Sequence, residues 1–197
     1  MTNFTKRTTL GLTLFLLVFA VTTGQSATLI KDKSSVTITG TSSLHDWHEN
    51  VGDFTINLSI TKNNGPVPSI GKATFTVRSS SVTSDNRLMT DKTLEALQAK
   101  KYPEITFVSN GSSSVVIKEG TFTGNVTGEL VLNGVTKRLS VPVNGSYAGD
   151  KLAISGSQKL KMNDYQIKSP TAMLGTLKTG DEVTVHFDLK FDISDNN

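Results

Sequence analysis

Apolar and polar residues alternate along most of the chain after residue 27, which predicts strands with one buried face. The clearest case is 183–193, where every second residue is apolar and the residues between them are mostly polar. Shorter stretches of the same pattern occur at 54–61, 73–77 and 105–108. Because successive side chains of a strand point to opposite faces, the aromatic residues in the apolar phase are predicted to point inward. These residues are Phe54, Phe75, Phe107, Phe187 and Phe191.

Short turns separate these strands. Glu119-Gly120 and Asn133-Gly134 each lie between two alternating segments, as in tight antiparallel hairpins. Many antiparallel strands must close into a barrel or stack as a sandwich, since open sheet edges promote aggregation. The pattern alone allows both folds. The lengths of the strand expected at 51–61 and of the last strand favour a barrel, whose tilted strands run far.

One segment breaks the alternation and predicts a short helix. Leu94 and Leu97 share one helical face, and Thr90 or Asp91 could cap the beginning of the helix with a side-chain oxygen. Tyr102-Pro103 is expected to end it, because the residue before a proline is disfavoured in the helical region.

The N-terminus predicts export. Lys6 and Arg7 precede an apolar run at 10–21, and small residues follow at 22–27, which is the order of a secretory signal peptide. The run is shorter than the roughly 20 residues that a membrane-spanning helix needs. We therefore expect residues 1–26 to be a signal peptide cut after Ser26 and residues 27–197 to be a single periplasmic or secreted domain. No second apolar run of spanning length follows, so this domain is expected to be soluble.

Composition removes several classes of function. The chain contains no cysteine, which excludes disulfides, thiolate metal sites, a cysteine nucleophile and a lipid-attached N-terminal cysteine. The net charge is +3, and Lys6 and Arg7 of the signal peptide account for two of these charges. The domain that remains is nearly neutral and has no large basic cluster, so nucleic acid is not an expected partner.

Three sequence motifs resemble those of the YceI-like family of bacterial secreted proteins. They are K-Y-P-E-I-T-F-V-S at 101–109, G-E-L-V-L-N-G-V-T-K at 128–137 and T-G-D-E-V at 179–183. The start at 40–47, G-T-S-S-L-H-D-W, resembles a variant found in some branches of the family, whereas typical members carry a different pattern there. The resemblance covers nearly all of the expected domain.

This resemblance implies an all-β fold, an extended antiparallel lipocalin-like β-barrel with one short helix. It further implies an apolar tunnel that binds the isoprenoid chain of a lipid such as a polyprenyl phosphate or a quinone. No cofactor, metal or catalytic activity is implied, and the oligomeric state stays open, with a homodimer as one option. From the residues alone, the inward faces could equally form a filled core in a structural or partner-binding domain.

The expected ligand-binding residues are the five phenylalanines together with His45 and Trp47. An indole suits a boundary between wet and apolar regions, so we place the loop around Trp47 at one end of the barrel, near the ligand head group. The alternative is that Trp47 plugs the barrel floor. His45 and His48 have a spacing that could serve a metal, with Asp46 and Glu49 as possible third ligands, but no strong metal motif is completed, which favours an ordinary loop pair. No G-x-S-x-G motif is present, and an enzyme is the third hypothesis.

Overall fold

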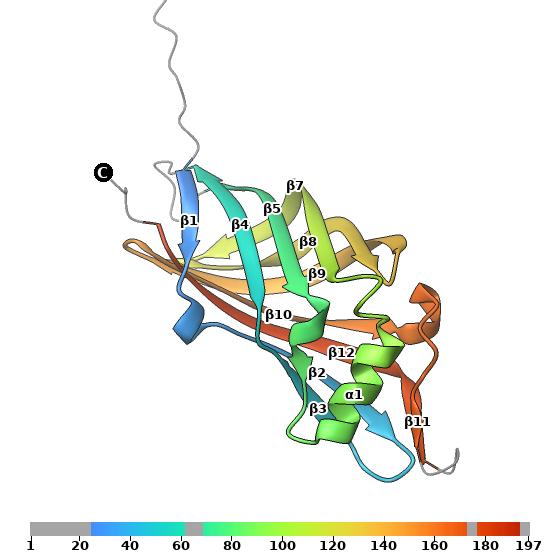
Figure 1. The fold of residues 1–197 in the computed structure, drawn as a ribbon. Helices are drawn as coiled ribbons and strands as arrows, with labels where there is room; N and C mark the ends of the chain where they lie inside the picture. Colours follow the sequence, from blue (N-terminus) through green and yellow to red (C-terminus); the bar gives the residue numbers. More distant parts are fainter. Residues whose placement is uncertain (1–24, 62–68, 173–176, 194–197) are drawn as a thin grey trace, which may run out of the picture.

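A computed structural model describes residues 25–61, 69–172 and 177–193, and antiparallel strands dominate it (Figure 1). The strands are β1 (Gln25–Leu29), β2 (Ser35–Ser42), β3 (Trp47–Val51), β4 (Phe54–Thr61), β5 (Ser69–Arg78), β6 (Val82–Thr83), β7 (Glu104–Lys118), β8 (Thr121–Leu132), β9 (Val135–Ala148), β10 (Lys151–Lys161), β11 (Thr171–Ala172) and β12 (Leu177–Asp192). The helical elements are α1 (Arg87–Ala96) and the short 3-10 helices η1 (Lys31–Lys33), η2 (Ser79–Ser81) and η3 (Met162–Tyr165). Within these described residues, no helix has both the length and the apolar character needed to cross a membrane.

Eight strands close into a barrel in the order β1-β4-β5-β7-β8-β9-β10-β12, and β12 returns to β1. The closing contact pairs Thr28 with Asp192 and Leu29 with Phe191. The pairings are antiparallel, and the sheet closes on itself. The structure therefore confirms the predicted all-β barrel and excludes the sandwich that the alternation also allowed.

The sheet extends beyond the closed barrel because β12 is long enough to pair with two strands along one edge. Its C-terminal end pairs with β1, and its 179–188 stretch pairs with β2, which continues to β3 and β6. The single strand expected at 51–61 is divided by Gly52 and Asp53 into β3, in the extension, and β4, in the barrel. Helix α1 lies against the extension and contacts β6 (Figure 1).

Helix α1 is confirmed, but the predicted cap is wrong, and the helix ends at Ala96, before the expected stop at Tyr102-Pro103. The helix begins at Arg87, and the side-chain oxygen of Asn86 accepts a hydrogen bond from Met89 N at 3.2 Å. Thr90 lies inside the helix, where its Oγ1 accepts a hydrogen bond from Ser84 N at 2.9 Å. An asparagine one turn earlier offers the same short oxygen acceptor, and its extended backbone is the conformation that a capping residue adopts.

The hairpin predictions are confirmed by the backbone. Asn133 and Gly134 adopt φ values of 52° and 77°, and Glu119 and Gly120 adopt 50° and 76°. This pair of left-handed residues matches the twist of the flanking strands. Asn133 is also buried, and its Nδ2 donates to Tyr165 O at 3.0 Å while Gln98 Nε2 donates to its Oδ1 at 3.1 Å. The turn therefore ties the end of the α1 segment and η3 to the barrel.

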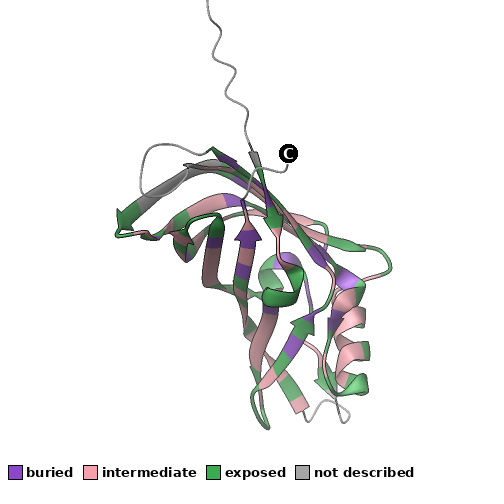
Figure 2. Cartoon of the chain, turned by 90° about the vertical axis from the view of Figure 1, so that its left-hand side faces the viewer, coloured by how far each residue is buried: buried purple, intermediate pink, exposed green. Residues whose placement is uncertain are grey.

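The packed core lies mainly in the closed part of the barrel. Its buried residues include Phe54, Leu152, Phe191 and Ile193. Helix α1 contributes no fully buried residue, and Figure 2 shows it in the colours of intermediate and exposed positions. The space beneath the helix is therefore packed differently from the rest of the interior.

Candidate binding cavity

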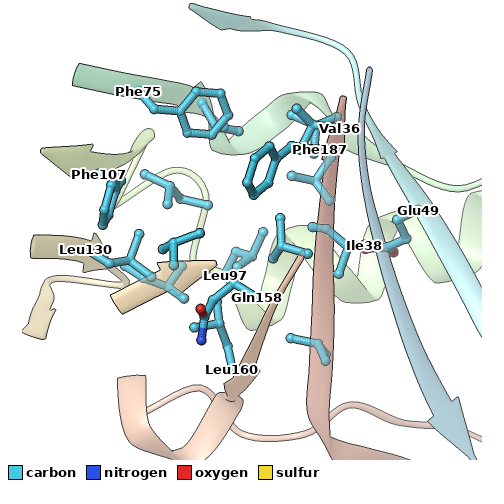
Figure 3. A pocket seen from close by; sticks show the side chains of 18 of the residues that line it. Val36, Ile38, Glu49, Phe75, Leu97, Phe107, Leu130, Gln158, Leu160 and Phe187 are labelled. Atoms are coloured by element: carbon cyan, nitrogen blue, oxygen red, sulfur yellow. The ribbon is translucent and has the colours of Figure 1, made fainter. Parts of the chain in front are cut away.

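An internal cavity of about 830 Å³ is enclosed by α1 and by inward-facing residues of the barrel and its extension. Figure 3 shows side chains from several elements converging on this space, among them Leu97 from the C-terminal cap of α1 and Leu130, Leu160 and Phe187 from the strands. Aliphatic and aromatic groups form most of the wall. The alternation of the strands explains this, since every inward position that is apolar adds to one continuous surface. Such a cavity can shelter an apolar ligand from water.

The five predicted phenylalanines all point inward, as the alternation indicated, but the structure divides them into two groups. Phe75, Phe107 and Phe187 line the cavity. Phe54 and Phe191 are absent from its wall and are packed into the core, with 4% and 0% of their surfaces exposed. Phe54 supports the wall from behind, because its ring lies 5.9 Å from that of Phe75, measured between centroids. Ligand contact stays a prediction for the first group, and the geometry gives the second group a supporting position.

Phe122 lines the cavity but was not among the predicted site residues. It is 2% exposed and lies on β8, beside the Glu119-Gly120 turn. The signal was available, because Phe122 follows a polar residue at the beginning of an alternating segment. The short alternation between the turn and the glycine at 124 made the inward phase of this strand difficult to identify.

Aromatic rings of the inner surface lie across glycines of the neighbouring strand. The register pairs Gly40 with Trp47, Gly145 with Phe122 and Gly156 with Phe187. A Cβ atom added to the glycine would lie too close to a ring atom of the partner. The distances would be 2.2 Å at Gly40, 2.1 Å at Gly145 and 2.5 Å at Gly156. Glycine therefore lets the ring lie along the wall, a known way of accommodating an aromatic group on a curved sheet. A ring that lies along the wall fills less of the interior than one that projects across it.

Trp47 was expected in a loop, but it is the first residue of β3, and it lines the cavity from that strand. Trp47 Nε1 donates a hydrogen bond to Thr41 O at 3.0 Å, which fixes the indole beside the β2–β3 turn. His45, in the β2–β3 turn, and Trp47 both line the cavity, whereas His48 lies on the exposed phase of β3. Within the described ranges, no group of three or more His, Asp or Glu side chains is arranged to hold a metal ion.

Three of the exposed lining residues, His45, Leu88 and Lys161, define a mouth of the cavity, which we call the α1 mouth. These residues come from the β2–β3 turn, the first turn of α1 and the end of β10, which Figure 1 shows at the same end of the molecule. Lys92 also lines the cavity, and its Nζ forms an ion pair with Glu95 at 2.8 Å. That hydrogen bond and the positive charge of Lys92 lower the pKa of Glu95.

Glu49 is a charged residue of the wall whose buried position the sequence analysis did not predict. It is 2% exposed, lines the cavity and accepts a short hydrogen bond from Thr93 Oγ1 of α1. Burial raises the pKa of its carboxyl group, and the hydrogen bond from Thr93 opposes that effect only in part. The sequence analysis placed residues 45–48 in a loop and did not predict a strand that runs through residue 49. The signal was the inward phase of β3, since Trp47, Glu49 and Val51 alternate with exposed residues.

Comparison with known proteins identifies relatives for this chain. The YceI-like domain matches residues 28–191. A UPF0312 protein of Pseudomonas putida strain W619 is 38% identical over 87 residues, which cover 41% of this chain and 43% of that protein. The chain thus aligns with less than half the length of this curated relative.

Solved structures share the fold. BcnA of Burkholderia cenocepacia superimposes with a TM-score of 0.64 at 22% identity, covering 82% of this chain and 98% of BcnA. A polyisoprenoid binding domain from Saccharophagus degradans gives a TM-score of 0.63 at 14% identity, covering 86% of this chain and 99% of that domain. At these identities the likeness supports the architecture, an extended barrel of the kind described above.

Proposed function

The chain belongs to the YceI-like domain family, and from that premise and the cavity we propose that it binds an amphipathic isoprenoid lipid without chemical conversion. The tail of the lipid, that of a polyprenyl phosphate or a quinone, would occupy the cavity, and its head group would lie towards the α1 mouth. The observation that carries this proposal is the apolar cavity of about 830 Å³. Small-molecule sites typically measure about 300–1,000 Å³ and have few polar groups.

Two further observations support a lipid over a filled structural core. Met89 and Ala96 of α1 and Leu97 at its C-terminal cap line the cavity and are only half-buried, so their apolar surface remains available to a ligand. The related fold from Saccharophagus degradans is described as a polyisoprenoid binding domain. A structural or partner-binding domain is the alternative function, and it gives no reason for the hollow beneath the helix.

Native mass spectrometry of the protein purified from its own host tests the proposal. We expect a complex whose additional mass is released by organic extraction and identified as an isoprenoid lipid. The matched variant is Ala96→Phe, which places a ring in the cavity and should reduce the bound fraction. Ala148→Phe adds the same ring at an exposed position and should leave the bound fraction unchanged. A protein that carries no lipid and binds none added to it would contradict the proposal.

We also propose that the protein is exported to the periplasm or secreted. The basic, apolar and small segments of residues 1–26 support this, although residues 1–24 lie outside the described part of the structure. Cleavage after Ser26 would leave Ala27, Thr28 and Leu29 to pair with β4 and β12. Intact-mass measurement of protein recovered from the periplasm should show a mature chain that begins between Gln25 and Thr28. A chain that retains Lys6 and Arg7 would contradict export with cleavage.

A further inference from the structure

Glu49 is the only Asp, Glu, Lys, Arg or His side chain that is buried within the described residues. An acidic group in an apolar interior is unfavourable unless it has a partner or a purpose there. The inward direction of this position does not explain why it carries a carboxyl group, because Trp47 and Val51, the inward neighbours of Glu49 on β3, are both apolar. The residue opposite Glu49 on β2 is Ile38, which also offers no polar contact.

The carboxyl group has one hydrogen-bond donor in the described structure. Thr93 Oγ1 donates to Oε1, and no described side chain donates to Oε2 or forms an ion pair with Glu49. Lys92, the residue before Thr93 on α1, forms its ion pair with Glu95 instead. Because Glu49 lines the cavity, the unused hydrogen-bonding capacity of its carboxyl group lies at the cavity wall, between β3 and α1 (Figure 3).

The charged groups around this position do not neutralise it. His45 of the β2–β3 turn and Lys161 of β10 line the cavity but are exposed at the α1 mouth. His48, the neighbour of Glu49 on β3, is on the exposed phase of the strand. Burial raises the pKa of the Glu49 carboxyl group, so its surroundings favour the uncharged acid. An uncharged carboxyl group can donate one hydrogen bond and accept others.

A second polar side chain also lines the cavity. Gln158 on β10 lines the cavity, and its Nε2 donates to Lys159 O at 2.8 Å. Its amide oxygen can still accept a hydrogen bond. A hydroxyl or carbonyl group of a ligand can therefore find partners at the wall. A phosphate cannot be accommodated in the same way, because it would lie beside an acid in an apolar space and force like charges together whenever that acid ionises.

We propose that Glu49 selects the head group of the bound lipid, accepting from or donating to an uncharged hydroxyl or carbonyl and rejecting an anionic phosphate. This inference rests on the proposed lipid-binding function and narrows its ligand class to neutral isoprenoids. Thr93 acts as a positioning residue, because its hydroxyl group donates its hydrogen bond to the carboxyl group of Glu49 and not to the ligand.

The test compares two probes that share a tail, geranylgeraniol and geranylgeranyl monophosphate. Their affinities for the delipidated mature protein would be measured by isothermal titration calorimetry at neutral pH. We expect the alcohol to bind at least about tenfold more tightly than the phosphate. In the Glu49→Gln variant, which preserves size and hydrogen bonding but cannot ionise, that preference should shrink to within about threefold. Asp91→Asn removes an exposed carboxylate from the same helix and should leave the preference unchanged.

A measurement on the unaltered protein keeps the inference testable if Glu49→Gln fails to fold. The ¹³C carboxyl resonance of Glu49 should move when the protein is saturated with geranylgeraniol. Equal affinities for the two probes, a preference that survives in Glu49→Gln, or a resonance that stays fixed at saturation would overturn the role of Glu49 and leave lipid binding intact. Failure of both probes to bind the unaltered protein would overturn the proposed function itself, and the inference with it.

Discussion

The same alternating strands build a packed part of the interior, where β1 and β12 close the barrel, and a hollow part, the cavity that barrel strands and the extension line together. In the closed part, pairing of β1 with β12 brings inner faces together, and Leu152, Phe191 and Ile193 are 1%, 0% and 0% exposed. Beneath α1 the sheet splays into β2, β3 and β6, and a helix with no fully buried residue covers the opening. Burial of apolar side chains thus depends on how the sheet closes as much as on the pattern of each strand.

The difference has consequences for both stability and binding. Side chains in a packed interior lose both transfer free energy and close contacts when they are truncated. Side chains that border an empty volume have fewer partners to lose, but they provide the surface that a ligand covers. We expect substitutions in the two regions to separate stability from affinity.

Phe191→Ala and Phe107→Ala should give the largest contrast. Truncating Phe191, which is fully buried in the core, should lower the free energy of unfolding by about 3–5 kcal/mol. Phe107 is half-buried at the cavity wall, so its truncation should cost only about 1–2 kcal/mol and should weaken lipid binding. Urea denaturation and lipid titration of both variants measure the two effects. Equal losses of stability would mean that the two regions are packed alike.

Gly156→Ala tests whether glycines keep the rings along the wall. The new Cβ would lie 2.5 Å from Phe187 Cζ and 2.4 Å from Pro142 O, so the ring must move. We expect a loss of about 1–3 kcal/mol in unfolding free energy and reduced affinity, because the displaced ring enters the cavity. Gly52→Ala is the matched control, since its nearest neighbour, Ser81 O, lies at 3.6 Å. Unchanged lipid affinity in a folded Gly156→Ala protein would argue against this role.

The buried carboxyl group of Glu49 should make stability fall as the pH rises. Its pKa in the folded state is raised above the ordinary value of 4.5, mainly by burial, so the unfolded chain loses this proton first. The stability that the protonated acid contributes is fully present below pH 4.5 and is lost as the pH rises through the folded pKa.

The measurement for Glu49 is the difference in unfolding free energy between the unaltered protein and Glu49→Gln across this range. Groups other than Glu49 titrate in both proteins and largely cancel in the difference. We expect Glu49→Gln to gain in relative stability as the pH increases. A difference that is constant or that changes in the opposite direction would show that the pKa of this carboxyl group is not raised in the folded protein.

Trp47 should give the smallest effect, a spectroscopic one. It is the only tryptophan of the chain and lies at the cavity wall beside the β2–β3 turn. Titration of delipidated protein with geranylgeraniol should shift or quench its emission, because the ligand changes the polarity around a half-buried indole. Saturable binding by calorimetry without any change in emission would place the ligand deeper in the cavity, away from Trp47.

The sequence by itself determined the local features of this fold. Alternation predicted the inward direction of Phe54, Phe75 and Phe187, and Asn133-Gly134 predicted a hairpin whose backbone angles the structure confirms. These features depend on neighbouring residues and on the two-residue period of a strand, both of which can be read along the chain. The helix was predicted for the same reason, but its cap was misplaced because several residues near its start could serve as acceptors.

Only the tertiary structure decided which inward residues are core and which border the cavity. That distinction depends on the pairing of β1 with β12, on the division of 51–61 at Gly52 and Asp53, and on the placement of α1. Glu49 shows the same limit, since its hydrogen-bond partner Thr93 lies 44 residues away in the sequence. Burial and cavity walls arise where distant segments meet, and a strand pattern specifies a direction for each side chain without specifying what lies opposite.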